Sequence, residues 1–539
     1  MPDPSSPPVS SAHADTFARD HLPPEDLWPT IEFTTPELSY PFRLNAATEL
    51  VDVPAATFGP DRPALRTPTG EVWSYGDLRT RSNQVAQVLV DLGLVPGQRV
   101  LLRSPNNPWT VAAWLGVLKA GGVAVTTMAA LRTRELMPIV ERTRPSIALV
   151  DNRFVEDAQA LPLKVVTYDD LAASAQQKPG EFTAVDTAAD DVALLAPTSG
   201  STGTPKITVH FHRDILSIDN TFGRHVLRLN PDDLVACTAP FAFTFGLGML
   251  VVFPLRAGAC ALLTEAATPA QVADLVEQHG VTVLATAPTA YKAILRDGLD
   301  GKLSGLRTAV SAGEHIPRET WQRLRDRLGL RVIDGIGATE LLHIFISAAG
   351  DDTRPGSTGK PVPGYRATVL GVDGEELGPG EPGRLGVIGP VGCRYLDDAR
   401  QKDYVVSGWN VTGDVFHRDE DGYFHYHARS DHMIVSSGYN IGGPEVEEAI
   451  DTHPDVLESA VVAKPDEERG SVVCAFVVLR EGVAGDDAKA REIQDHVKQT
   501  IAPYKYPRDV RFRTSLPRNA SGKLQRFALR KIVEDEVSA

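Results

Sequence analysis

The sequence predicts a two-domain protein of the α/β and α+β class. We expect a large N-terminal domain of layered sheets flanked by helices and a small, mobile C-terminal α+β domain. With 539 residues, the chain exceeds what one hydrophobic core usually organises. Short apolar runs alternate with segments of helical periodicity along most of the chain, which is typical of βα units. The last hundred or so residues follow a different pattern.

Several strands of the expected large domain end in small, polar, glycine-containing loops. "VALLAP" (192–197) predicts a buried strand. "VTVLATAPTAYKAIL" (281–295) predicts a strand ending near Thr286 and a helix from Pro288. The stretch 306–324 repeats this arrangement with Pro317 in the first turn of a helix, and "LRVIDGIGATE" (330–340) predicts a further strand. Because ligands of open α/β sheets lie at the carboxyl ends of strands, we expect these loops to converge on one site.

The C-terminal part reads as a separate small unit. "PEVEEAIDTHPDV" (444–456) predicts a short amphipathic helix, residues 458–482 predict two strands around a charged turn, and "REIQDHVKQTIA" (491–502) predicts a second helix. The expected division is therefore a disordered tail over 1–25, a large domain over 26–430 and a small lid domain over 431–539. The tail is rich in Pro and Ser and has no apolar segment.

Composition excludes several classes of protein. The net charge of −16, from 54 basic and 70 acidic residues, argues against general binding to nucleic acid or to an anionic membrane. The four cysteines have no metal-ligand spacing and are too few for a disulfide framework, which indicates a reducing compartment. No apolar stretch is a convincing membrane span. We expect a cytoplasmic protein.

The stretch "LLAPTSGSTGTPK" (194–206) has the residues that a polyphosphate needs. Its glycines let the backbone N–H groups approach an anion closely, while Ser and Thr hydroxyls and Lys206 supply donors and positive charge. It is not the P-loop of nucleoside triphosphatases, because no glycine directly precedes Lys206 and no Ser or Thr follows it.

This stretch resembles the phosphate-loop signature of the acyl-adenylate-forming enzymes, a superfamily that includes acyl- and aryl-CoA ligases, luciferases and peptide-synthetase adenylation domains. Four further stretches match in the family's order: "SAGEHIP" (311–317), "DGIGATE" (334–340), "VTGDVFHRDEDGYFHYHARSD" (411–431) and "PRNASGKLQR" (517–526). The chain is thus identified as a member over nearly its whole length.

The resemblance implies roles for individual residues. Thr339 would contact phosphate, Glu340 would bind Mg²⁺, and Asp414 would accept the ribose hydroxyls. Lys523 would be the mobile catalytic lysine, acting with Glu340 and Thr339. The residues implied for ATP binding are Thr198, Ser199, Gly200, Ser201, Thr202, Gly203, Lys206, Gly313, Glu314, Asp334, Gly335, Asp414 and Arg429. Asp431 would be the hinge of the small domain, and Ser437, Gly438 and Tyr439 would lie at coenzyme A.

The segment 239–255 corresponds to the part that lines the acyl pocket in such enzymes. Phe241, Phe243 and Phe245 alternate with smaller residues and could share one strand face, either as core packing or as an aromatic wall for a flat aryl acid. Further stretches resemble the benzoate and 2-aminobenzoate CoA ligase branch. His343 is interpreted either as a structural residue or as a hydrogen-bond partner of an ortho amino or hydroxyl group on the aryl acid. The residues expected at the acyl group are Phe241, Phe243, Ala312, Ile336, Gly337 and His343.

The histidine pairs His210/His212 and His425/His427 each lie two residues apart and share a strand face, but no third ligand is near in sequence. We expect them to serve packing rather than zinc binding.

The leading prediction is an ATP-dependent aryl-CoA ligase that forms an aryl-adenylate and pyrophosphate, then transfers the acyl group to coenzyme A and releases AMP. The expected acid is 2-aminobenzoate or a benzoate relative, with ATP, Mg²⁺ and coenzyme A required. One alternative loads the aryl acid onto the phosphopantetheine of a carrier protein, and another is a non-catalytic adenylate-binding relative. The sequence leaves a homodimer open.

Overall fold

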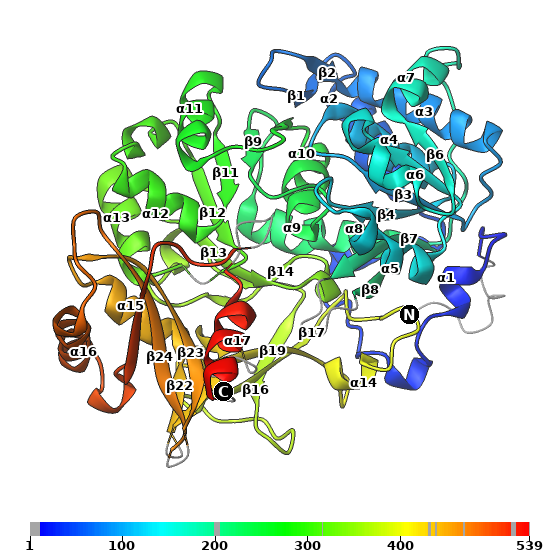
Figure 1. Ribbon diagram of the computed structural model, residues 1–539. Coiled ribbons are helices and arrows are strands. Elements are labelled where there is room, and N and C mark those ends of the chain that lie inside the picture. Colours follow the sequence, from blue (N-terminus) through cyan, green and yellow to red (C-terminus); the bar gives the residue numbers. More distant parts are fainter. Residues whose placement is uncertain are drawn as a thin grey trace. The chain divides into compact units, whose positions relative to one another are not determined.

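A computed structural model describes residues 11–198, 205–314, 316–429, 433–436, 439–466, 469–518 and 524–537 (Figure 1). The chain divides into two compact units. Unit 1 contains Met1–Ala367 and Val387–Asn410, and unit 2 contains Thr368–Gly386 and Val411–Ala539. The α/β fold with a larger N-terminal and a smaller C-terminal part confirms the predicted fold class. The domain boundary at residue 430 stays a prediction, and Asp431 lies outside the described residues.

The first sheet of unit 1 has six strands in the order β6-β5-β3-β4-β7-β8. All pairs are parallel except β7 with β8, so the chain reverses there over a short connection. The strand β7 begins at Val192, as predicted, and its first five residues are buried. The strands are β3 (Arg99–Arg103), β4 (Val123–Thr127), β5 (Ile147–Val150), β6 (Lys164–Thr167), β7 (Val192–Thr198) and β8 (Lys206–Phe211).

The second sheet of unit 1 has nine strands in the order β15-β14-β13-β12-β11-β9-β10-β1-β2. Its predicted strands β11, β12 and β13 are neighbours and run parallel, which confirms that their carboxyl ends share one edge. The strands are β1 (Pro63–Arg66), β2 (Val72–Ser74), β9 (Leu234–Cys237), β10 (Cys260–Leu262), β11 (Val283–Thr286), β12 (Thr308–Ala312), β13 (Ile333–Gly337), β14 (Ile344–Ser347) and β15 (Lys360–Pro361).

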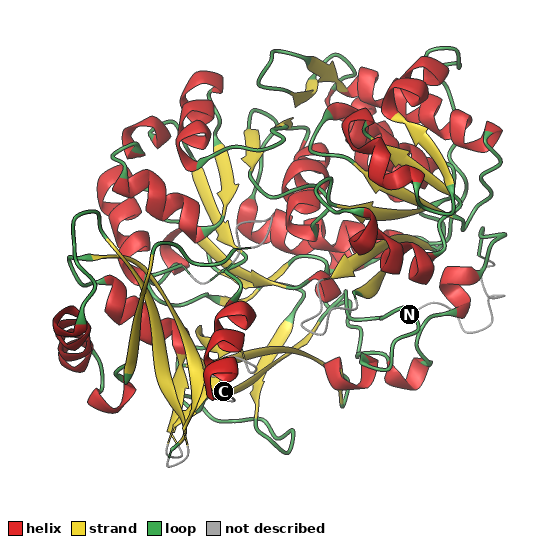
Figure 2. Ribbon diagram, viewed as in Figure 1, coloured by secondary structure: helices red, strands yellow, loops and turns green. Residues whose placement is uncertain are grey.

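Helices flank these sheets (Figure 2). Their starts follow capping chemistry: Ser74 and Asp77 cap α3 reciprocally, Thr268 and Gln271 cap α11, and α12 begins at Pro288 as predicted. In the described ranges no helix combines the length and apolarity needed to cross a bilayer. The helices are α1 (Phe17–Asp20), α2 (Val53–Phe58), α3 (Tyr75–Asp91), α4 (Pro108–Lys119), α5 (Thr133–Thr143), α6 (Val155–Gln159), α7 (Tyr168–Ala175), α8 (His212–Ile218), α9 (Thr244–Leu247), α10 (Phe253–Ala257), α11 (Pro269–His279), α12 (Pro288–Arg296), α13 (Arg318–Leu328) and α14 (Gln401–Tyr404).

The remaining strands form three small sheets with the orders β16-β17-β19-β18 (β20 on β19), β21-β22 and β23-β24-β25. The predicted C-terminal helix, two strands and helix are confirmed as α15, β23, β24 and α16, around a core that includes Ile450, Val477 and Ile493. The elements are β16 (Arg366–Leu370), β17 (Gly383–Ile388), β18 (Val405–Val406), β19 (Trp409–Arg418), β20 (Phe424–Arg429), β21 (Met433–Ser436), β22 (Tyr439–Gly442), α15 (Gly443–Asp451), β23 (Val456–Asp466), β24 (Gly470–Leu479), α16 (Asp487–Thr500), β25 (Asp509–Arg513) and α17 (Arg526–Val537).

The prediction of disorder was wrong for residues 11–25, which pack against the rest of unit 1. The fully buried carboxylate of Asp191 accepts hydrogen bonds from the Ser11 hydroxyl, the Ala12 N–H (3.0 Å) and the Arg19 guanidinium (2.9 Å). Ala18 is 1% exposed and belongs to the core of the six-stranded sheet. A buried charge needs partners, and this segment supplies them, which its own composition could not reveal. Residues 1–10 lie outside the described ranges.

We predict that Asp191→Ala lowers the free energy of unfolding by about 3 kcal/mol, because buried donors lose a charged acceptor. The same variant should expose residues 11–25 to limited proteolysis. The matched control is Asp190→Ala, whose residue is exposed. Equal urea midpoints and equal proteolysis rates for the two variants would contradict this anchoring role.

Candidate active site

The carboxyl ends of β12 and β13 carry most of the predicted nucleotide and acyl residues. Ala312 ends β12, with Gly313 and Glu314 following it, and Asp334 to Gly337 lie within β13. Ser311 and Asp334 are register partners on the two strands, so their side chains lie on adjacent backbones at the same level. The structure therefore brings these predicted residues together at one sheet edge.

Three buried side chains at this edge have polar atoms without a hydrogen-bond partner among the described residues: Ser311 Oγ, Asp334 Oδ1 and both ring nitrogens of His343. All three residues are at most 6% exposed. Burial raises the pKa of Asp334 and lowers the pKa of His343 to about 3. Unpaired buried polar groups are costly, so a ligand that offered these atoms partners would gain binding energy at this edge.

A strained turn joins the predicted residues Thr339, Glu340 and His343. The short helix η8 (Thr339–Leu341) is followed by Leu342 at φ +67°, and the His343 N–H donates to the Leu341 carbonyl at 2.8 Å. Such a γ-turn is unfavourable for a non-glycine residue and persists only where the surroundings impose it. Here it turns the chain from the Glu340 carboxylate to the buried His343 ring.

The two ends of the predicted phosphate loop are fixed as neighbours. Thr198 ends β7 and pairs with Lys206, the first residue of β8. The loop residues between them, Ser199, Gly200, Ser201, Thr202 and Gly203, lie outside the described residues.

Tyr395 connects Lys206 with Glu340. The Lys206 ammonium donates to the Tyr395 hydroxyl at 3.1 Å, and that hydroxyl donates to Glu340 Oε1. Tyr395 is fully buried. The sequence reasoning missed this residue, since a single tyrosine outside the matched stretches carries no signal of its own.

A series of buried polar side chains contacts the backbone of Thr339. His210 Nε2 hydrogen-bonds the Thr339 carbonyl at 2.8 Å, and its other ring nitrogen lies 4.0 Å from the Asp214 carboxylate. Arg394 pairs with Asp214 at 3.2 Å, with both side chains fully buried. Burial lowers the pKa of His210 to about 4, so the ring is neutral. His210 was expected only to pack, and the structure gives it a bond to the site backbone as well.

The predicted aromatic strand face is wrong. Residues 240–252 form a turn followed by α9 and η6 (Gly248–Val252), so Phe241, Phe243 and Phe245 share no strand. The turn requires glycine at 246, where a Cβ would lie 2.2 Å from the Pro240 carbonyl oxygen. Phe241 instead packs edge-on against Trp114, and Phe243 precedes α9.

An aromatic shell encloses His343 from other elements. Its ring centroid lies 5.3 Å from that of Phe222, 5.6 Å from Phe245 and 4.7 Å from Phe253. Gly248 permits this approach, because a Cβ there would meet His343 Cδ2 at 2.4 Å. The sequence reasoning named His343 but missed Phe222 and Phe253 as its neighbours, since helices far apart in sequence supply them.

Asp414 and Arg429 belong to unit 2. They stand directly opposite each other on β19 and β20 and form an ion pair at 3.2 Å, and Arg429 also donates to the Thr412 carbonyl at 3.0 Å. Tyr439 begins β22. Lys523, Asp431, Ser437 and Gly438 lie outside the described residues. The roles implied for all these residues stay predictions.

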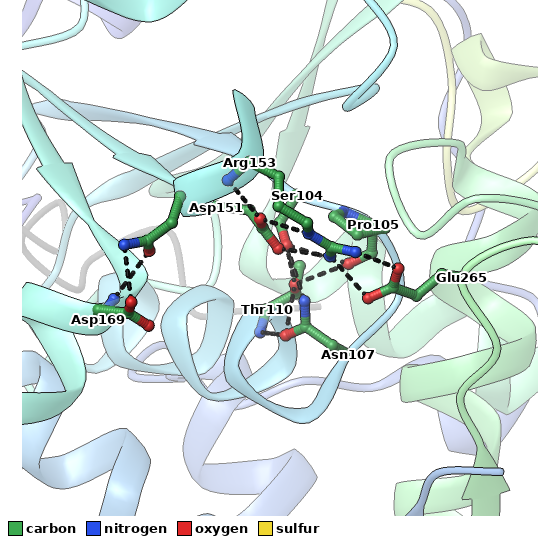
Figure 3. Close-up of polar contacts among 9 residues, drawn as sticks. Ser104, Pro105, Asn107, Thr110, Asp151, Arg153, Asp169 and Glu265 are labelled. Carbon is green, nitrogen blue, oxygen red and sulfur yellow. Dashed lines mark hydrogen bonds and ion pairs between the residues drawn. The ribbon is translucent and has the colours of Figure 1, made fainter. Parts of the chain in front are cut away.

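A second polar cluster lies at the carboxyl ends of β3, β5 and β6 (Figure 3). Several of its residues line a cavity of about 350 Å³. Arg153 pairs there with both Asp151 and Glu265 at 2.8 Å. Its guanidinium is thus neutralised, and Glu71 and Asp169 add further negative charge to the lining. This cluster does not suit a phosphate group, and it contains none of the predicted site residues.

The family model described as AMP-binding enzyme matches residues 53–394, and the model of the AMP-binding enzyme C-terminal domain matches residues 445–523. A benzoate–CoA ligase of Thauera aromatica is 34% identical over 92% of this chain and 98% of its own. A 3-hydroxybenzoate–CoA ligase of Aromatoleum sp. is 30% identical over 91% of this chain and 97% of its own. A solved structure of the anthranilate CoA ligase AuaEII with anthranoyl-AMP superposes with a TM-score of 0.89 at 31% identity, covering 94% of this chain and all of that one.

Fold and site together define an adenylate-forming ligase. The chain belongs to the AMP-binding enzyme family, by a match to more than half of its length. The predicted membership of the acyl-adenylate-forming superfamily, in the aryl-CoA ligase branch, is confirmed, as is the class of AMP-forming acid–thiol ligase.

The buried histidines of unit 1 predict a pH dependence of stability. Burial lowers the pKa of His212 and His343 to about 3 and that of His210 to about 4. In the unfolded chain these rings titrate near 6.5, so the unfolded state binds more protons below that pH. We expect the free energy of unfolding to fall between about pH 6.5 and 4, by up to about 1.4 kcal/mol per pH unit for each histidine.

Urea unfolding at pH 7.5, 6.0 and 5.0 measures this slope. Carboxylates also titrate in this range, so the His343→Phe variant isolates one ring by making the slope shallower. An unchanged slope would show that His343 carries no depressed pKa in the folded chain.

Proposed function

We propose that the acid activated by this ligase is 2-aminobenzoate or a closely related ortho-substituted benzoate. The observation that carries the proposal is His343, a neutral ring with two unpartnered nitrogens inside a shell of three phenyl rings. The named substrates of the relatives, benzoate, 3-hydroxybenzoate and anthranilate, support the choice of an aryl acid.

The physical argument is one of pairing. A flat aromatic ring suits the faces and edges that Phe222, Phe245 and Phe253 offer. Unsubstituted benzoate would leave at least one His343 nitrogen unpaired, since the Phe245 backbone can serve only one of them, at a cost of about 1–3 kcal/mol. An ortho amino group can donate to the unprotonated nitrogen. Its presence would thus be recognised by a hydrogen bond that an unsubstituted ring cannot form.

In the proposed first step a carboxylate oxygen attacks the α-phosphorus of ATP, and pyrophosphate leaves. Asp334 Oδ1, buried and unpartnered, would accept from the adenine amine, and Lys206 would offset phosphate charge. Lys523 would approach the same phosphate. The Glu340 carboxylate is a hard oxygen donor with Oε1 engaged by Tyr395, which suits a Mg²⁺ ion held mainly by phosphate and water. When bound, that ion would supply charge neutralisation at the phosphates.

In the proposed second step a thiol sulfur attacks the acyl carbon and AMP leaves. We propose coenzyme A as the acceptor, with Ser437, Gly438 and Tyr439 beside it, and Asp431 as the hinge. The Asp414 carboxylate would hold the ribose hydroxyls with Arg429 beside it. A cytoplasmic location remains a prediction from the sequence, which leaves a homodimer open.

The proposal is tested by pyrophosphate release with benzoate, 2-aminobenzoate, 2-hydroxybenzoate and a medium-chain fatty acid. We expect 2-aminobenzoate to give the highest kcat/KM and acyl-CoA to form when free coenzyme A is added. Lys523→Ala should lower the rate of pyrophosphate release by about 10²–10³. Preference for the fatty acid would overturn the pocket proposal, and adenylate formation without acyl-CoA would favour the carrier-protein alternative.

His343→Phe keeps a flat ring and removes both nitrogens. We expect kcat/KM for 2-aminobenzoate to fall about 10–100-fold, equivalent to the loss of one buried hydrogen bond. Benzoate serves as the internal control, because its turnover should change much less. If both acids lose activity equally, His343 supports the fold of the pocket and does not read the ortho group.

A further inference from the structure

We propose that Tyr395 is a positioning residue. Its hydroxyl prevents Lys206 of the phosphate loop and the carboxylate of Glu340 from forming a direct ion pair, so that both can interact with Mg·ATP. The inference rests on the proposed function, since it takes Lys206 and Glu340 as the groups that meet the nucleotide. It assigns a role to a residue outside all the matched motifs.

The contacts of Tyr395 define this role. One phenolic hydroxyl has one proton to donate and lone pairs to accept. Here the proton goes to Glu340 Oε1, and a lone pair receives the Lys206 ammonium at 3.1 Å. The ammonium also lies 4.8 Å from the centre of the tyrosine ring. The Lys206 ammonium and the Glu340 carboxylate, which are far apart in sequence, thus both hydrogen-bond the hydroxyl oxygen of Tyr395.

The backbone fixes the position of this oxygen. The segment around Tyr395 runs along the free edge of β8: Thr208 bridges to Tyr395, Val209 donates to the Arg394 carbonyl at 2.8 Å, and Leu396 donates to the Ile207 carbonyl at 2.9 Å. Tyr395 is fully buried, and Tyr404 packs edge-on against its ring at 5.8 Å. The side chain therefore has little freedom to turn away.

Without the hydroxyl, an ammonium and a carboxylate this close would attract each other directly. A Lys206–Glu340 ion pair would take up both the cation meant for phosphate and the oxygen meant for the metal. Tyr395 satisfies each charge with a single neutral oxygen. Within the part of the chain that the structure describes, Glu340 Oε2 and two of the three ammonium protons form no further hydrogen bond.

The test is binding of ATP to the full-length protein by calorimetry, with and without Mg²⁺, for wild type and Tyr395→Phe. Mg²⁺ should increase the affinity of the wild type for ATP. We expect this increase to be about 10-fold smaller in the variant, which corresponds to the loss of one hydrogen bond to a charged group. Tyr404→Phe is the matched control, because it removes a neighbouring buried phenol hydroxyl and should bind Mg·ATP as wild type does.

A double-mutant cycle separates positioning from general damage. Glu340→Gln alone should lose the Mg²⁺-dependent gain, and Tyr395→Phe added to it should cost nothing more. Additive losses, or an unchanged Mg²⁺-dependent gain in Tyr395→Phe, would overturn the inference. If wild type shows the Tyr395-dependent gain yet releases no pyrophosphate with any aryl acid, the proposed substrate fails while this inference stands. If wild type binds no ATP, both fall.

Discussion

The arrangement of the site depends on strand β8, which carries functional side chains at both of its ends. Its first residue, Lys206, pairs with Thr198 of β7 on one edge and reaches Tyr395 on the other. Near its last residue, His210 holds the Thr339 carbonyl and lies beside the buried Asp214–Arg394 pair. A strand cannot shift one residue without turning every side chain to the opposite face. The register of β8 therefore places the loop lysine and Thr339 together.

The polar groups of unit 1 differ in how fully they are paired. Asp191 is paired with the N-terminal segment, and Arg153 is paired with its two carboxylates. Those at the ends of β12 and β13 have unpaired atoms, as in Ser311, Asp334 and His343. Leaving a buried polar group unpaired costs stability, and a ligand bound at the ends of β12 and β13 would reduce that cost.

Local sequence patterns correctly predicted the helices and strands whose own residues are enough to decide their conformation. The strands β11 to β13, the helix from Pro288 and the C-terminal α15–β23–β24–α16 order all follow from apolar periodicity and proline position. The strand predicted over Phe241–Phe245 was wrong because the conformation of this stretch is not decided by its local pattern. Alternation predicts a strand, but the tight approach of Gly246 to Pro240 and the packing of helices around it decide otherwise.

By itself the sequence determined the family, the order of the motifs and the residue types of the site, because these lie in short contiguous stretches with fixed spacing. Only the tertiary structure decided which distant groups touch: Tyr395 with Lys206 and Glu340, His343 with Phe222 and Phe253, and residues 11–25 with Asp191. The physical reason is that hydrogen bonds and packing act over a few ångströms in space. Separation along the chain does not record such contacts.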